Sequence, residues 1–296
     1  MKIAFIHMDP RPGAVCLNRA TVQRGLEAAA SHGASWVVTP ELCISGYTFT
    51  TRPRAEGLEW CGRQRGAHQC VWDRLPVGDG AGEDEPVGTD WITAQPDDWM
   101  KGIHETARRK GITLFLAHPE RAVDSAGETR LYNSVFVLGP EGGEPASYRK
   151  IKVTGGHESW SSPGEGAVTV SCSGVRVGLL ICADAWFPEM AQELKRRGAQ
   201  LLVAPSAWPP GFCGPEDTWE RRSGETDLPL LVCNRTGREE GAMLDYRYAE
   251  SVVAHRGRRL LEWSTDRPAL LMFDWDMHAM ESASTAFQVV PLPLER

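Results

Sequence analysis

Three side chains with useful chemistry each stand where an apolar run of the sequence ends. Cys182 closes the run VRVGLLIC, Glu41 follows SWVVTP, and Lys150 ends ASYRK. A thiol has a pKa near 8.5, so it needs a base or a positive charge beside it to attack well at neutral pH. A cysteine in an apolar run is by itself more often a packed core residue. Here, however, a carboxylate and an ammonium also stand at the ends of apolar runs, and this shared position favours a nucleophilic role for the cysteine.

The elements that must position these residues are strands alternating with helices. Predicted strands over residues 2–8, 35–41 and 112–120 are separated by predicted helices over 18–31 and 97–110. This alternation is typical of βαβ units, in which the strands are buried on both faces. Ligand sites in such sheets form at the carboxyl ends of the strands. The three polar residues therefore stand where a site is expected.

Part of the sheet structure must be antiparallel, because several predicted strands follow one another without a helix. Further strands are predicted over 131–139, 146–153, 167–172, 175–182, 200–205 and 228–237. Pro188 is suited to the first position of a helix that ends before Gly198, and a second helix is predicted over 218–226. Together these patterns predict a mixed α/β fold.

The composition is typical of an ordinary globular protein rather than of a nucleic-acid-binding or membrane protein. The 296 residues are 42% hydrophobic and 24% charged, with a net charge of −7. The acidic balance argues against a nucleic-acid surface, and no run approaches the ~18 apolar residues of a membrane span. Eight scattered cysteines, three of them within apolar runs, suggest reduced thiols and a cytoplasmic location. We expect a small-molecule ligand.

Two segments depart from the alternating pattern. Residues 51–95 are rich in Arg, Gly, Asp and Trp and are interpreted as an insertion that forms a lid over the site. Residues 277–296 show no clear partner in the chain and are interpreted as a C-terminal arm on another subunit, which leaves 1–276 as the main domain. Within the insertion, Cys61, His68 and Cys70 lack a fourth ligand at a recognised zinc spacing, so no metal is predicted. A basic cluster there is interpreted as a solvated face that could alternatively bind a substrate carboxylate: Arg52, Arg54, Arg63 and Arg65.

Three motifs, VVTPELCISGY, SYRKIKV and GLLICADAWFPE, resemble the active-site motifs of the nitrilase, or carbon–nitrogen hydrolase, superfamily, in the same chain order. The resemblance implies a Glu-Lys-Cys triad of Glu41, Lys150 and Cys182. A looser match, GGHESWSSPG, implies that Glu158 is an additional active-site glutamate. It also implies a four-layer α-β-β-α sandwich with two mixed sheets, and a homodimer, formed through helices near the nucleophile, or a higher homo-oligomer.

The implied chemistry needs no metal or organic cofactor. Glu41 would act as general base toward the Cys182 thiol, while Lys150 and the backbone N–H of Ala183 would stabilise the oxyanion. The resemblance places Tyr47, Trp186 and Trp208 near the pocket, where they would shape the acyl part of the substrate, although each could simply be a core aromatic.

The residues after the cysteine favour one branch of the superfamily. CADAWFPE resembles the pattern of amidases and carbamoylases, whereas nitrile-hydrolysing branches look more like C-W-E-N. We therefore expect hydrolysis of a small amide or N-carbamoyl compound through a cysteine thioester. The alternatives are a nitrilase, an acyl transferase that uses the same thioester, and a non-catalytic binding protein.

Overall fold

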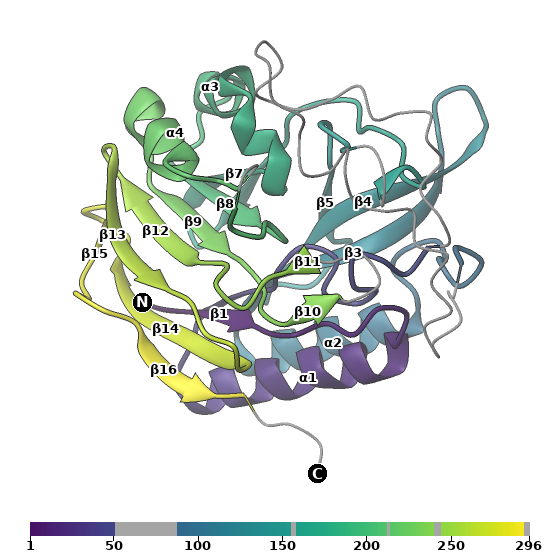
Figure 1. Ribbon diagram of the computed structural model, residues 1–296, viewed down its shortest axis with the longest axis horizontal. Helices are drawn as coiled ribbons and strands as arrows, with labels where there is room; N and C mark the ends of the chain where they lie inside the picture. Colours follow the sequence, from purple (N-terminus) through teal and green to yellow (C-terminus); the bar gives the residue numbers. More distant parts are fainter. Residues whose placement is uncertain (51–87, 155–157, 212–213, 240–243, 293–296) are drawn as a thin grey trace.

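The computed structural model describes residues 1–50, 88–154, 158–211, 214–239 and 244–292, which contain two large sheets and four α-helices (Figure 1). The first sheet consists of β1 (Lys2–His7), β2 (Trp36–Val38), β3 (Thr113–Val123), β4 (Thr129–Leu138), β5 (Ala146–Arg149), β14 (Ala269–Asp276), β15 (Glu281–Ser282) and β16 (Gln288–Pro291). The second consists of β6 (Thr169–Cys172), β7 (Val175–Leu179), β8 (Leu201–Pro205), β9 (Leu230–Cys233), β12 (Ser251–His255) and β13 (Arg258–Trp263). A short pair is formed by β10 (Arg238–Glu239) and β11 (Leu244–Asp245). The helices are α1 (Val15–Ser31), α2 (Asp98–Lys110), α3 (Pro188–Arg196) and α4 (Thr218–Thr226), with a 3-10 turn η3 (Cys182–Trp186).

Both large sheets are mixed, as predicted. The first runs β15-β14-β1-β2-β3-β4-β5 with β16 also on β14, and the second runs β13-β12-β9-β8-β7-β6. Parallel pairing is confined to β1-β2-β3 and β7-β8-β9, where helices connect the strands. The hairpins predicted without an intervening helix are antiparallel.

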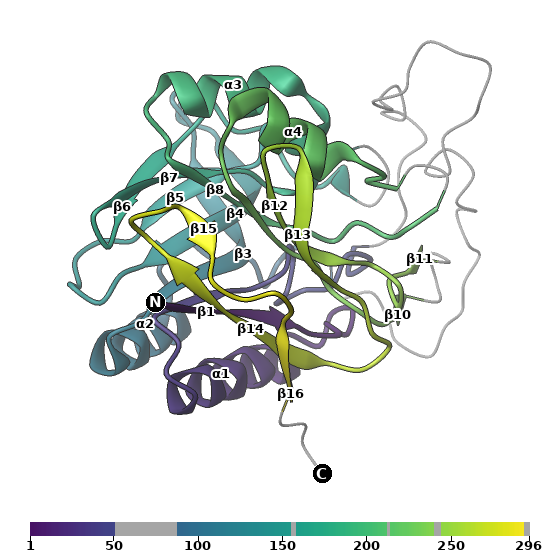
Figure 2. The ribbon, with the colours of Figure 1, turned by 90° about the vertical axis from the view of Figure 1, so that its left-hand side faces the viewer.

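The two sheets stack face to face between two pairs of helices, which gives four layers (Figure 2). Strand β1 shows why: Ile3 and Phe5 belong to the apolar cluster shared with the second sheet, while Ala4 and Ile6 belong to the cluster shared with α1 and α2. Successive side chains of a strand point to opposite faces, so a strand that is covered on both faces is apolar throughout. The four-layer sandwich implied by the resemblance is confirmed.

The predicted helices are confirmed, with their ends fixed by local chemistry. The Asp97 side chain accepts a hydrogen bond from the Met100 N–H at 2.8 Å and caps α2, whose other end is Gly111 in the left-handed region with φ 68°. Pro188 is the first residue of α3. The turn η3, which begins at Cys182, therefore lies between the end of β7 and the start of α3.

The strands that lead to the site are shorter than predicted. Strand β2 ends at Val38 because the next residue binds β3 through its side chain: the Ala117 N–H donates to the Thr39 hydroxyl at 2.9 Å. Pro40 then has no N–H to donate to a ladder. The chain therefore leaves the sheet two residues before Glu41.

The segment after Asp276 pairs within its own chain, in contrast to the expectation that it lacks a partner there. Strands β15 and β16 both pair antiparallel with β14, and Phe287 and Leu292 are buried. The apolar alternation of this short segment is weak, so its pairing was not visible from the sequence. Packing against another subunit stays a prediction.

Most of the predicted insertion, residues 51–87, lies outside the described residues, as do the Cys61, His68 and Cys70 pattern and the basic cluster. Its described end is packed onto the body of the protein. Trp91 contacts Phe49 edge to face at 5.6 Å between ring centroids, and the Arg121 Nε donates to the Ile92 carbonyl at 2.7 Å.

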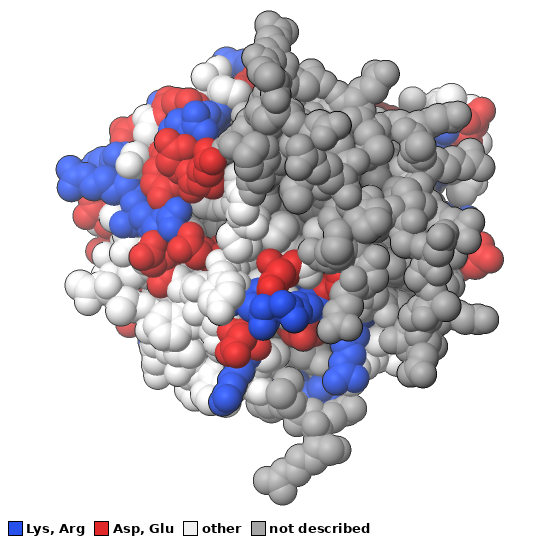
Figure 3. Space-filling model, in the orientation of Figure 1, with Lys and Arg blue, Asp and Glu red and all other residues white. Residues whose placement is uncertain are grey.

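No helix in the described part of the chain has the length and apolarity that a membrane crossing requires. On the face shown in Figure 3, the described acidic and basic residues are interspersed. Among the described ion pairs, Arg259 contacts Glu220, Glu250 and Glu262.

Candidate active site

Three strand ends bring the predicted residues together. Strands β2 and β3 are parallel, and β4 is antiparallel to both β3 and β5, so β2 and β5 run in the same direction. Glu41 and Lys150 therefore follow the same edge of the first sheet, and Cys182 follows β7 of the second sheet. The site lies where the two sheets face each other.

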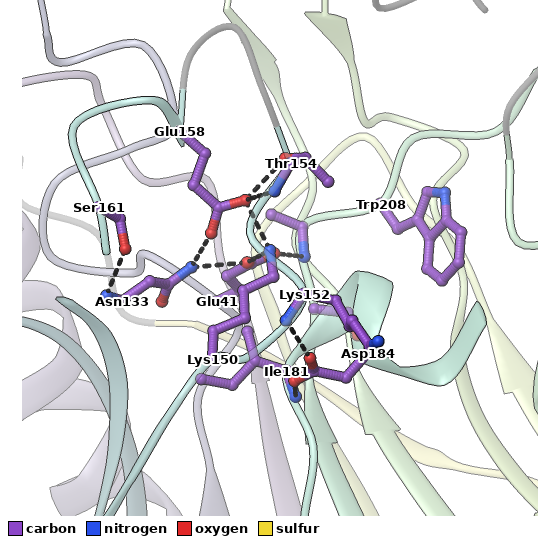
Figure 4. A network of polar contacts seen from close by, with 12 residues as sticks. Glu41, Asn133, Lys150, Lys152, Thr154, Glu158, Ser161, Ile181, Asp184 and Trp208 are labelled. Atoms are coloured by element: carbon purple, nitrogen blue, oxygen red, sulfur yellow. Dashed lines mark hydrogen bonds and ion pairs between the residues drawn. The ribbon is translucent and has the colours of Figure 1, made fainter. Parts of the chain in front are cut away.

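Lys150 is the centre of the polar cluster (Figure 4). Its Nζ donates to Glu41 Oε1 at 2.7 Å and to Glu158 Oε2 at 2.8 Å, and all three side chains are 0% exposed. Burial by itself would lower the pKa of Lys150, but the Glu158 and Glu41 carboxylates outweigh it and raise the pKa well above its usual value. The ammonium is therefore a fixed positive charge.

Glu41 is held by groups from both sheets. Its Oε2 accepts the Ala207 N–H at 3.0 Å, just after β8, while Oε1 accepts from Lys150. Burial raises the pKa of Glu41, and the positive charge of Lys150 opposes that shift. A carboxylate with a raised pKa is a stronger base than an ordinary glutamate.

Cys182 begins η3 with φ 45°, in the left-handed region that costs a side-chain-bearing residue about 1 to 2 kcal/mol. The thiol is buried, and the charges of Glu41 and Lys150 both act on its pKa. Burial raises the pKa of the thiol well above its usual value; the negative charge of Glu41 adds to the shift and Lys150 opposes it. The resting group is therefore a protonated thiol with a base beside it. Ala183, the next residue, is also buried in this turn.

Glu158, the looser of the motif matches, reaches the same cluster. In addition to Lys150, its Oε2 accepts from the Thr154 N–H at 3.0 Å and the Thr154 hydroxyl at 2.7 Å. The Tyr47 hydroxyl donates to the same oxygen at 3.4 Å. Glu158 is thus a positioned, buried carboxylate and not part of an exposed turn.

Asn133 is a member of the cluster that the motifs did not reveal. Its Nδ2 donates to Glu41 Oε1 at 2.8 Å and to Glu158 Oε1 at 2.7 Å, so one amide group joins the two carboxylates. The Lys150 N–H donates to the Asn133 carbonyl at 2.8 Å, which fixes β4 against the end of β5. The available signal was a polar residue within the apolar predicted strand LYNSVFVLG.

Tyr47 lies in the cluster with its ring buried and its position set by a buried ion pair. The backbone N–H groups of Tyr47 and Thr48 donate to Glu239, which pairs with Arg235. Arg235 is itself 4.3 Å from the centroid of the Tyr246 ring. This support was not predicted, because Arg235 and Glu239 lie far from Tyr47 in the sequence.

Trp208 and Trp186 are in edge-to-face contact beside the polar cluster. Their ring centroids are 4.7 Å apart edge to face, and Trp208 also contacts Trp219 at 5.0 Å. Ala207, which binds Glu41, directly precedes Trp208. A hollow of about 220 Å³ is lined by Trp208, Gly211, Tyr248 and Glu250 among others, so Trp208 lies between the polar cluster and this hollow.

Within the described part of the chain, no group of three or more His, Cys, Asp or Glu residues lies close enough to hold a metal ion. The described cysteines are free thiols: Cys16, Cys43, Cys172, Cys182 and Cys233.

Comparison with known proteins identifies the family of this arrangement. The family model described as carbon-nitrogen hydrolase matches residues 2–284, nearly the whole chain. The chain belongs to the carbon-nitrogen hydrolase family. This carbon-nitrogen hydrolase is therefore an enzyme that acts on carbon–nitrogen bonds other than peptide bonds, as the sequence motifs predicted.

Two curated relatives of this carbon-nitrogen hydrolase are amidases. An omega-amidase of Homo sapiens is 32% identical over 193 residues, covering 62% of this chain and 68% of the relative. An N-carbamoylputrescine amidase of Arabidopsis thaliana is 25% identical over 206 residues, covering 63% of this chain and 67% of the relative.

Solved structures show the same fold. An amidase of Nesterenkonia AN1 from the nitrilase superfamily matches with a TM-score of 0.67 and 24% identity, covering 95% of this chain and 92% of that one. One structure of that amidase carries the acetamide moiety of fluoroacetamide added covalently to its active-site cysteine.

Proposed function

We propose that this carbon-nitrogen hydrolase cleaves a small amide or N-carbamoyl compound through a thioester on Cys182, releasing ammonia or an amine. The observation that carries the proposal is the buried contact of one lysine with two glutamates, whose charges act on the buried thiol of Cys182. Removing three charged groups from water costs free energy, and buried charged groups of this kind are typical of functional sites.

The first step is attack on the carbonyl carbon. Glu41 takes the thiol proton as Cys182 Sγ forms its bond to carbon, and the carbonyl π electrons move to the oxygen. General-base assistance of this kind typically contributes about 10² to 10⁴ in rate. The raised pKa values of both groups make such a transfer necessary, because little free thiolate exists beforehand.

The second requirement is stabilisation of the oxyanion. The Lys150 ammonium supplies a fixed charge, and the Ala183 N–H, just after the nucleophile, supplies a hydrogen-bond donor. Each donor could contribute roughly 3 kcal/mol to the transition state. Because Glu41 and Glu158 hold Lys150 Nζ in place, no reorganisation is needed as the charge develops.

Collapse of the intermediate and hydrolysis complete the cycle. The carbon–nitrogen bond breaks, Glu41 returns its proton to the leaving nitrogen, and a thioester remains on Cys182. Water then loses a proton to Glu41 or Glu158 and attacks the thioester carbon. The thiol regains the proton, and the acid leaves.

Support for an amide rather than a nitrile comes from the sequence after the nucleophile, and relatives of both kinds exist, since a nitrilase of Pyrococcus abyssi is 26% identical over 242 residues. CADAWFPE resembles the amidase pattern, and the omega-amidase and the N-carbamoylputrescine amidase are both amide-cleaving by name. The acyl group would lie on the Trp208 and Trp186 side of the cluster, with Tyr47 near the opposite carboxylate. We further propose that the enzyme works in the cytoplasm as a homodimer or a higher homo-oligomer.

The test is mass spectrometry of a trapped intermediate combined with an ammonia assay. Glu158→Gln protein is incubated with separate panels of aliphatic amides, N-carbamoyl compounds and nitriles, with Cys182→Ala as the control. We expect a mass increase on the Cys182 peptide with an amide or carbamoyl compound, absent in the control, and ammonia release by the wild type. Adding hydroxylamine measures how much acyl group passes to an amine. Ammonia release by Cys182→Ala at the wild-type rate, or no adduct and no ammonia from any panel, would overturn the proposal.

A further inference from the structure

The carboxyl group of Asp184 lies behind the reactive cluster and joins the two segments that carry its nucleophile and its lysine. Its Oδ2 accepts the Ile181 N–H at 2.9 Å and the Tyr148 hydroxyl at 2.8 Å, and its Oδ1 accepts the Lys152 N–H at 2.9 Å. Asp184 is 0% exposed. Figure 4 shows its carboxylate bonded to the backbone N–H groups of Lys152 and Ile181. No step of the mechanism above uses this buried carboxylate.

One set of these bonds closes a ring around the nucleophile. The Asp184 N–H donates to the Ile181 carbonyl at 3.0 Å, while the Asp184 carboxylate accepts the Ile181 N–H. Cys182 and Ala183 lie between the two ends of this ring. The ring therefore holds Cys182 at φ 45°, a conformation that persists only where its surroundings determine it strongly.

The other set fixes the lysine. Tyr148 lies two residues before Lys150 and Lys152 lies two residues after it, and both donate to Asp184. The Asp184 carboxylate is thus hydrogen-bonded to the chain on both sides of Lys150 and to the residue before Cys182. The two segments come from different sheets, and short bonds between them set the distance from the thiol to the ammonium.

We propose that Asp184 is a positioning residue that sets the geometry of Cys182 and the Ala183 N–H relative to Lys150. The expected effect on kcat rests on the proposed function, whereas the expected effect on the reactivity of the Cys182 thiol does not. All three partners are donors, so the site requires an acceptor at both carboxylate oxygens. An Asn side chain has the same shape but presents an NH₂ group at one of these positions, facing a donor.

The experiment compares Asp184→Asn with a matched variant, Asp124→Asn. Asp124 also accepts two backbone N–H groups and one side chain, at 2.9, 2.9 and 3.0 Å, but in the turn between β3 and β4. Each protein is treated with iodoacetamide, and the modification rates of Cys182 and of the exposed Cys16 are read by peptide mass spectrometry. Cys16 serves as an internal reference within every sample.

We expect Asp184→Asn to lower the Cys182 modification rate about 10²-fold relative to Cys16, the cost of roughly 1 Å of misplacement at a reacting centre. With an amide that the wild type hydrolyses, kcat should fall by a similar factor while KM changes little. Asp124→Asn should keep the wild-type ratio. Tyr148→Phe removes one donor to Asp184 and leaves the ring intact, so it should lower the Cys182 modification rate by a smaller factor. This variant replaces Asp184→Asn in the test if Asp184→Asn fails to fold.

A wild-type Cys182 to Cys16 ratio in folded Asp184→Asn, or in Tyr148→Phe where Asp184→Asn does not fold, would overturn the proposal, whatever the change in melting temperature. The alkylation readout requires no substrate. If the wild type hydrolyses no amide, the proposed function fails while the role of Asp184 is still decided by the modification rates.

Discussion

Cys182, which follows β7, and Cys233, which ends β9, are both buried at the carboxyl ends of strands of the second sheet, but their surroundings differ. Cys233 is the last residue of β9, and its thiol donates to the Val38 carbonyl at 3.3 Å. Burial raises the pKa of Cys233 well above its usual value, as it does for Cys182. Only Cys182 has a carboxylate and an ammonium from the other sheet around it, together with a left-handed backbone.

Under the proposed function, we expect burial alone to leave a thiol unreactive. A thiol that is hard to ionise becomes a nucleophile only when a base takes its proton during attack. At the end of β9 the available partners are backbone carbonyls, which cannot accept a proton. At the end of β7 the partner is Glu41, whose own raised pKa suits it to that task.

The largest expected effect comes from alanine substitution of the two cysteines. Cys182→Ala should lower kcat/KM by about 10⁴-fold or more, because the covalent route is lost. Cys233→Ala should leave kcat/KM within a few-fold and lower the free energy of unfolding by about 1 kcal/mol. Ammonia release and urea unfolding measure the two quantities. Equal activity losses in the two variants would remove the distinction drawn here.

Glu41→Gln tests whether the base separates the two thiols. The substitution keeps the size of the side chain but removes its proton-accepting charge, so kcat should fall by about 10² to 10⁴. The measurement is steady-state ammonia release. Glu27→Gln, on the surface of α1, provides a control that should match the wild type. A Glu41→Gln enzyme with normal kcat would assign the base to another residue.

Asn133→Leu tests the amide that joins the two carboxylates. A hydrogen bond to a charged group is worth about 1.5 to 3 kcal/mol, so its loss should lower both the free energy of unfolding and kcat/KM, the latter by roughly 10- to 100-fold. Asn18→Leu is the matched control, because Asn18 Nδ2 also donates to two acceptors, the carbonyls of Arg11 and Ile44. The control should lose stability and keep its activity. Activity loss in proportion to stability in both variants would contradict a special role for Asn133.

The smallest expected effect is the pH dependence of the wild type. Glu41 must be ionised to accept the thiol proton, and burial raises its pKa. As pH falls through that raised pKa the base becomes protonated, so kcat/KM should decrease tenfold per pH unit. This acid limb should lie above the ordinary glutamate value of about 4.3. A limb at or below that value would show that the buried environment does not set the base strength.

The sequence by itself predicted the α/β class, the helices and four polar residues of the site, Glu41, Lys150, Cys182 and Glu158. The signals used are all local. They are apolar runs of strand length, a Pro at the start of a helix, and three motifs in a fixed order. Cys182, Glu41 and Lys150 were found because each lies at the end of such a run, where side chains leave the sheet.

Tertiary structure alone decided how these residues are held. Asn133, Asp184 and the Arg235 and Glu239 pair contact the site from strands and turns that are far apart in the sequence. The pairing of β15 and β16 with β14 is likewise a matter of which edge is available. Hydrogen bonds between distant segments depend on sheet order and register, and neither is written in the spacing of residues along one segment. The local pattern therefore shows which groups could react, and the fold decides which of them meet.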